Sequence, residues 1–197
     1  MPVHPPYRSG FCLWTNLVEQ GYGFCTGRIS AYGTGHVEGN LIYRGRIMNI
    51  GDAARDFTLK DGDGNDWTLS AHRGKTVVLL FYPGDNTPVC TAQLCSVRDH
   101  WSEYQATGAE VVGISTDTVE SHKGFAEEHS LPLRLLSDAD RKVSEMYDMK
   151  SWLPGRSARG VVVIDKEGKI AYTKAEALSL FKPSDADVLE AIKRADS

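Results

Sequence analysis

The chain has 197 residues, of which 41% are hydrophobic and 24% charged, a size and composition typical of one globular domain with at most a short appendage. Its formal net charge of -4 gives no reason to expect nucleic acid or an anionic membrane surface as a partner, and its longest apolar run is far shorter than the roughly 18 residues that a membrane helix needs. Four cysteines in a chain long enough to fold on its own core, without a signal-peptide pattern at its start, favour a reducing compartment, and we expect a cytoplasmic protein.

Residues 1–47 differ from the rest, since they contain four Arg and two Glu but neither Lys nor Asp, and their glycines follow no helical or strand period. We expect a poorly structured extension, although a small hairpin fits the same pattern. The scarcity of serine argues against the alternative of a transit peptide. Met48 opens a segment that is typical of a natural start, so we expect the functional domain to be residues 48–197. A misassigned start codon is one explanation of the extension.

From Met48 on, short strands alternate with helices. The predicted elements, in chain order, are strands at Asp56–Leu59, Trp67–Leu69 and Thr76–Tyr82, a helix at Pro88–Thr107, a strand at Glu110–Ser115, a helix at Val119–His129, a strand at Leu133–Leu136, a short helix at Arg141–Tyr147, strands at Gly160–Asp165 and Ile170–Lys174, and a helix at Ala186–Ala195. The last two strands flank a tight turn, which predicts a hairpin. This alternation indicates an α/β three-layer sandwich with a mixed central sheet.

Cys90 is predicted to lie in the first turn of a helix. Thr87 is a good N-cap residue, and Pro88 suits the first helical position because its missing N–H would have no partner there. Cys90 then takes the third helical position, where unpaired backbone N–H groups and the positive end of the helix dipole favour the reactive thiolate. The alternative, a cysteine that serves only as a small buried hydrophobe, is disfavoured by this context.

A second cysteine, Cys95, follows five residues after Cys90. On an intact helix this spacing gives about 7.5 Å of rise and about 140° of rotation, so the two Cα atoms would lie about 8–9 Å apart. A disulfide spans at most roughly 7 Å, so the two sulfurs bond only if the first turns of the helix unwind. A zinc site is not favoured, because Cys90, Cys95 and His100 lack the spacing of common zinc ligand sets. His100 and His122 are interpreted as packing or surface histidines.

Peroxide chemistry uses a cysteine pair of this kind, because oxidation of the first thiolate gives a sulfenic acid that a second thiol converts to a disulfide. A nearby cation would stabilise the charge that develops on the departing oxygen. Two alternatives remain open. The first is a thiol–disulfide exchange protein, although that chemistry usually uses C-x-x-C. The second is a redox sensor in which melting of the helix signals to a partner.

PGDNTPVC, from Pro83 to Cys90, matches the Pro-x-x-x-Thr-x-x-Cys motif of the peroxiredoxins, and Cys95 is placed as in their peroxiredoxin Q type, also called bacterioferritin comigratory protein. The segments Gly113–Asp138 and Arg159–Ile170 are similar to later parts of that subfamily, so the resemblance extends from about Met48 to the C-terminus. It implies a thioredoxin-like fold within the alkyl hydroperoxide reductase and thiol-specific antioxidant family.

The resemblance also implies a role for each matching residue. Cys90 would be the peroxidatic cysteine, Cys95 the resolving cysteine and Thr87 the hydroxyl that positions the peroxide. Pro83 would shield the sulfur from bulk water, and Arg159 would be the cation that stabilises the thiolate and polarises the peroxide.

The implied activity is that of an atypical two-cysteine peroxidase acting on hydrogen peroxide and organic hydroperoxides. Thioredoxin is the implied reductant. The resemblance implies a monomer, with a dimer as the alternative, and no metal or organic cofactor is expected. The chain departs from the family at Gln93, where Glu is usual, and at Gly84 and Val89, where Lys and Gly are more familiar.

Overall fold

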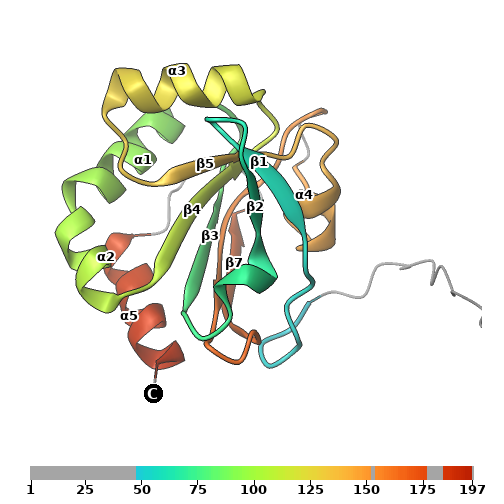
Figure 1. The fold of residues 1–197 in the computed structure, drawn as a ribbon, viewed down its shortest axis with the longest axis vertical. Coiled ribbons are helices and arrows are strands. Elements are labelled where there is room, and N and C mark those ends of the chain that lie inside the picture. Colours follow the sequence, from blue (N-terminus) through green and yellow to red (C-terminus); the bar gives the residue numbers. More distant parts are fainter. Residues whose placement is uncertain (1–47, 152–153, 177–183, 197) are drawn as a thin grey trace, which may run out of the picture. The chain divides into compact units, whose positions relative to one another are not determined.

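The structure is a computed structural model that describes residues 48–151, 154–176 and 184–196 (Figure 1). The predicted extension, residues 1–47, lies outside the described residues. Within the described part, seven strands form one sheet in the order β2-β1-β5-β4-β3-β6-β7. The strands are β1 (Thr58–Asp61), β2 (Asp66–Thr68), β3 (Val77–Phe81), β4 (Glu110–Ser115), β5 (Arg134–Ser137), β6 (Arg159–Ile164) and β7 (Ile170–Glu176).

The sheet is mixed. Its centre, β3, β4 and β5, is parallel, whereas β6 pairs with β3, β7 with β6, and the β1–β2 hairpin with β5 in antiparallel fashion. The centre is parallel because helices connect its strands, and β3 consists of five buried residues, VVLLF, as expected for a strand covered on both faces.

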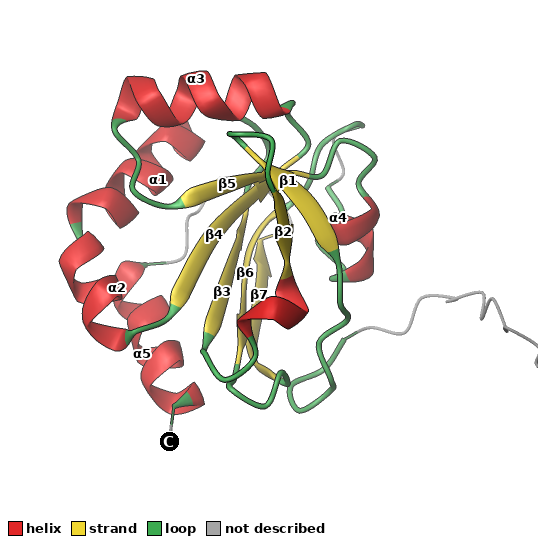
Figure 2. Ribbon diagram, viewed as in Figure 1, coloured by secondary structure: helices red, strands yellow, loops and turns green. Residues whose placement is uncertain are grey.

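Helices cover both faces of this sheet (Figure 2). The helices are α1 (Pro88–Asp99), α2 (Trp101–Thr107), α3 (Val119–His129), α4 (Lys142–Met146) and α5 (Asp185–Ala195), with a 3-10 turn, η1, at Leu69–His72. One hydrophobic core lies under α1, α2, α3 and α5, which contribute for example Leu94, Tyr104, Phe125 and Ile192. The other core lies on the opposite face, under α4 and the segment that precedes the sheet. No helix in the described ranges is long and apolar enough to cross a membrane.

The predicted fold class is confirmed, and β4 and α3 have the predicted bounds residue for residue. The single helix predicted from Pro88 to Thr107 is wrong, because the chain bends at His100 and divides it into α1 and α2. His100 leaves helical geometry (φ -100, ψ 14), and its ring Nδ1 lies 2.9 Å from the Ser96 carbonyl oxygen. The bend lets α2 pack on α5, where the Tyr104 hydroxyl donates to Asp185 at 2.9 Å.

The register of β3 and β6 brings two distant parts of the chain together. Phe81, the last residue of β3, pairs with Gly160, so the beginning of β6 lies beside the end of β3. Because side chains alternate along a strand, Arg159 shares a face with Val161, which belongs to the core under α1. The sheet therefore directs the side chain of Arg159 toward the helix that carries Cys90.

Candidate active site

The loop that follows β3 is held in place through its backbone. The Ser157 hydroxyl donates to the carbonyl oxygen of Tyr82 at 2.6 Å, and the Arg156 guanidinium donates to that of Pro83 at 3.2 Å. Pro83 itself is buried. Both donors come from the segment just before β6, so the same strand pairing that places Arg159 also fixes the loop. The sequence contained no local signal for Ser157 or Arg156 beyond their closeness to Arg159.

Gly84 lies where a larger residue would meet two neighbouring side chains. A Cβ atom at this position would lie 2.5 Å from Nη1 of Arg156 and 3.0 Å from a carboxylate oxygen of Asp117. The lysine that the family more often has here would therefore need Arg156 to move. Glycine at this position is matched to the arginine that holds the loop.

Thr87 occupies the N-cap position of α1 with the extended backbone that an N-cap residue adopts (φ -89, ψ 138). Its hydroxyl makes no capping hydrogen bond to the helix; instead it donates to the carbonyl oxygen of Gly84 at 3.3 Å. This arrangement uses the hydroxyl proton and leaves the lone pairs of the oxygen to accept a hydrogen bond from a bound molecule. The hydroxyl is thus oriented by the loop.

Cys90 is the third residue of α1, as the sequence predicted, and its side chain is fully buried. Nη2 of Arg159, also buried, donates to the Cys90 sulfur at 3.2 Å. The guanidinium and the N-terminus of α1 therefore both direct positive charge toward this sulfur. The two residues lie 69 positions apart in the chain and meet through the register of β3 and β6.

Gln93 completes this contact. Its side-chain oxygen accepts a hydrogen bond from Nη1 of Arg159, while Nη2 of the same guanidinium binds the Cys90 sulfur. Gln93 and Cys90 lie on consecutive turns of α1, so the planar guanidinium binds one residue on each turn. Because the amide is neutral, it orients the guanidinium and does not neutralise its positive charge. A glutamate at this position would neutralise that charge.

Cys95 lies on the same helix but is not part of this contact. It is half-buried, and both cysteines are free thiols. Because α1 is continuous from Pro88 to Asp99, the two cysteines lie on an intact helix. The structure therefore pairs the Cys90 sulfur with Arg159, places Thr87 at the start of the same helix and Pro83 in the preceding loop, and leaves Cys95 outside this contact.

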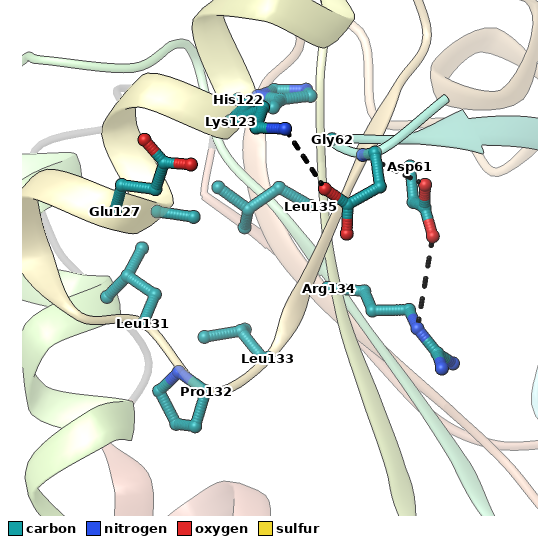
Figure 3. Close-up of a pocket in the computed structure, with 12 residues that line it drawn as sticks. Asp61, Gly62, His122, Lys123, Glu127, Leu131, Pro132, Leu133, Arg134 and Leu135 are labelled. Atoms are coloured by element: carbon teal, nitrogen blue, oxygen red, sulfur yellow. Dashed lines mark hydrogen bonds and ion pairs between the residues drawn. The ribbon is translucent and has the colours of Figure 1, made fainter. Parts of the chain in front are cut away.

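A pocket of about 430 Å³ lies elsewhere, between α3, β5 and the turn that joins β1 to β2 (Figure 3). Leu131 and Leu133, which precede β5, and Leu135 within it line one side, and an ion pair joins Lys123 to Asp63 at 3.6 Å. None of the predicted site residues lines it. The chemistry of the cysteine pair is therefore not located in this pocket.

Comparisons with known proteins agree with this geometry. The profile of the AhpC/TSA family matches residues 50–173. Over 129 residues the chain is 47% identical to chloroplastic peroxiredoxin Q of Triticum aestivum, a stretch that covers 64% of this chain and 58% of that protein. It is 46% identical over 127 residues to chloroplastic peroxiredoxin Q of Arabidopsis thaliana, covering 62% of this chain and 57% of that one. The match thus spans less than two thirds of these relatives' length.

Solved structures give the same result. The peroxidoxin BcpB of Mycobacterium tuberculosis is 36% identical, with a TM-score of 0.66 over 75% of this chain and 96% of that one. PrxQ of Xylella fastidiosa is 26% identical, with a TM-score of 0.68 over 76% of this chain and 98% of that one. The fold is thioredoxin-like, as in these peroxiredoxins.

The predicted cytoplasmic location is wrong on this comparison, because the similar peroxiredoxin Q proteins are chloroplastic by name. The prediction rested on cysteine usage, which reports only whether a compartment is reducing. Sorting is directed by segments outside the catalytic fold, so the composition of the folded domain carries no information about it.

Three features agree: the motif from Pro83 to Cys90, the pairing of Arg159 with the buried sulfur, and the match of the family profile over residues 50–173. The chain belongs to the AhpC/TSA family, and within it the chain is similar to peroxiredoxin Q.

Proposed function

We propose that this protein is a thiol peroxidase that reduces hydrogen peroxide and organic hydroperoxides, with Cys90 as the peroxidatic cysteine. The observation that carries the proposal is the buried contact between Arg159 and the Cys90 sulfur, 3.2 Å long, at the first turn of α1. The proposal places the activity in residues 48–197.

In the first step, the Cys90 thiolate attacks one oxygen of the peroxide and the O–O bond breaks. The sulfur becomes a sulfenic acid, oxidised by two electrons, and the other oxygen leaves as water or an alcohol after taking up a proton. Arg159 stabilises the negative charge that develops during this transfer. The Thr87 hydroxyl, which donates to Gly84, accepts a hydrogen bond from the peroxide and so orients it.

In the second step, the Cys95 thiol attacks the sulfenic sulfur, the S–S bond forms and water leaves. Both cysteines lie on α1, so the first half of this helix must unwind before the sulfurs meet. We infer that a thioredoxin dithiol then reduces the disulfide and that the protein works as a monomer. The unwound state would also expose the disulfide to that reductant.

The test is the mass of the intact protein, with peptide mapping, before and after one equivalent of hydrogen peroxide. A loss of about two mass units, mapped to a bond between Cys90 and Cys95, is expected for the two-cysteine mechanism. If both thiols remain unmodified, Cys90 is not an activated thiolate and the proposed function is wrong.

Oxidation is also expected to lower amide hydrogen-exchange protection between Val89 and Val97. The second half of α1 is fastened to its neighbours, since the Ser96 hydroxyl donates to Asp185 at 2.5 Å and Arg98 donates to the His129 carbonyl at 2.8 Å. We therefore expect the loss to be largest before Ser96 and protection in α2 to be kept. Exchange measured on reduced and oxidised protein checks this, and unchanged protection in the oxidised form would contradict unwinding.

A further inference from the structure

Behind the loop that carries Thr87, a carboxylate is buried among three donors. Oδ1 of Asp85 accepts from the Tyr82 hydroxyl at 2.8 Å. Oδ2 accepts from the Ser121 hydroxyl at 2.7 Å and from Nδ1 of His122 at 2.9 Å. The side chains of Asp85 and His122 are 2% and 0% exposed, so neither is a surface group. The interpretation of His122 as a mere packing or surface histidine is therefore incomplete.

The protons of this cluster are assigned by the geometry. Burial, together with the neighbouring charge of Asp85, raises the pKa of Tyr82 well above its ordinary value, so its phenol stays protonated and donates. Burial alone would raise the pKa of Asp85, but hydrogen bonds from His122 and Ser121 outweigh it, and the pKa of this carboxyl is lowered. Asp85 is therefore an anion at neutral pH, and Nδ1 of His122 must carry the proton that it donates.

The other ring nitrogen takes no part in this cluster. Nε2 of His122 is buried and has no hydrogen-bond partner among the described residues. His122 therefore contacts Asp85 through Nδ1, and its other ring nitrogen makes no hydrogen bond to the described residues. Figure 3 shows His122 beside Lys123 on α3, at one end of the pocket described above.

Asp85 transmits this restraint to the reactive loop. It directly follows Gly84, whose carbonyl oxygen accepts the Thr87 hydroxyl proton. Its own backbone N–H donates to a carboxylate oxygen of Asp117 at 2.8 Å. The next residue, Asn86, adopts a left-handed conformation (φ 57) that reverses the chain into the helix. The peptide between Gly84 and Asp85 is thus held on both sides just before the chain turns.

We propose that His122 is a positioning residue for peroxide reduction: by holding Asp85 it fixes the Gly84 carbonyl and, through it, the direction of the Thr87 hydroxyl. This inference rests on the proposed function, which assigns the peroxide to that hydroxyl. His122 contacts neither the sulfur nor the peroxide, so its removal affects the orientation of the oxidant and leaves the thiolate itself intact.

Two isosteric substitutions in the full-length protein separate the two nitrogens. In His122→Asn the amide nitrogen takes the place of Nδ1 and still donates to Asp85, whereas in His122→Gln it takes the place of Nε2 and the donor is lost. We expect the second-order rate of Cys90 oxidation by hydrogen peroxide to fall about tenfold in His122→Gln and to stay within about threefold of wild type in His122→Asn, because small errors in orientation are costly. His129→Asn, the same change elsewhere on α3, is the matched control.

Alkylation of Cys90 by iodoacetamide, followed by mass spectrometry, is the second readout. It reports the nucleophilicity of the sulfur without the need for an oriented peroxide, so we expect it to change less than about twofold in both variants. A general loss of structure would slow both reactions together. Equal peroxide rates in His122→Asn and His122→Gln, or a parallel fall in alkylation, would overturn the inference.

Ser121→Ala keeps the test decisive if His122→Gln does not fold. This half-buried hydroxyl is one of the three donors to Asp85, and its loss is expected to slow peroxide oxidation about threefold with alkylation unchanged. An unchanged peroxide rate in Ser121→Ala would then overturn the inference. Failure of the proposed function is a separate outcome, because in that case the wild-type Cys90 itself is not oxidised by peroxide.

Discussion

Replacing Cys90 with serine is expected to abolish peroxide consumption, with a loss on the order of 10⁴-fold or more, as is found when the nucleophile of a covalent enzyme is removed. A serine hydroxyl stays protonated beside Arg159 and cannot form a sulfenic acid, so neither the first step nor the disulfide is available. The measurement is hydrogen peroxide consumption with thioredoxin, thioredoxin reductase and NADPH.

Cys95→Ser is the matched control for that variant. It keeps the contact between Arg159 and Cys90, so the first oxidation is expected at the wild-type rate. Without a resolving thiol, the sulfenic acid persists and a second equivalent of peroxide converts it to the sulfinic acid, about 32 mass units above the thiol. Continued turnover of Cys90→Ser with thioredoxin, or unimpaired cycling of Cys95→Ser, would contradict the proposed assignment of the two cysteines.

Local sequence patterns predicted the parts of the fold that local interactions determine. The strand Glu110–Ser115 and the helix Val119–His129 appear as predicted because each has a clear period and clear boundaries, including the N-cap Thr118, whose side chain accepts from the backbone of Ser121. The bend at His100 was missed. The bend brings α2 into contact with Asp185 of α5, and no sequence pattern around His100 predicts this distant partner.

The candidate site divides in the same way. The placement of Cys90 on the first helical turn followed from Thr87 and Pro88 alone, because both residue types suit the start of a helix, although the Thr87 hydroxyl makes no capping hydrogen bond. The approach of Arg159 to the sulfur depends on strand register, and only the resemblance to a family pointed to it in advance. The link between Asp85 and His122 spans 37 positions, and the motif that contains Asp85 leaves that position unspecified, so it did not predict the contact.

Arg159→Met is expected to lower the second-order rate of Cys90 oxidation by about 10²- to 10³-fold, the usual loss when one preorganised donor to developing charge is removed. Methionine fills the buried space but offers no donor to the sulfur and none to Gln93. Arg159→Lys keeps the charge and loses the planar fork, so we expect an intermediate rate. Stopped-flow oxidation by hydrogen peroxide measures each rate, and thermal unfolding verifies that the variants fold.

Two comparisons decide what the arginine contributes. Arg134 lies on β5, away from the site, and pairs with Glu110 of β4 at 3.1 Å. Arg134→Met is therefore expected to leave the oxidation rate unchanged. Alkylation of Cys90 separates the two roles of Arg159: a fall equal to that of peroxide oxidation means that the guanidinium only stabilises the thiolate. A larger fall for peroxide means that it also stabilises the leaving oxygen, because alkylation involves no peroxide bond. An oxidation rate of Arg159→Met within about threefold of wild type would contradict both roles, since the lost donor would then contribute less than about 1 kcal/mol to the transition state.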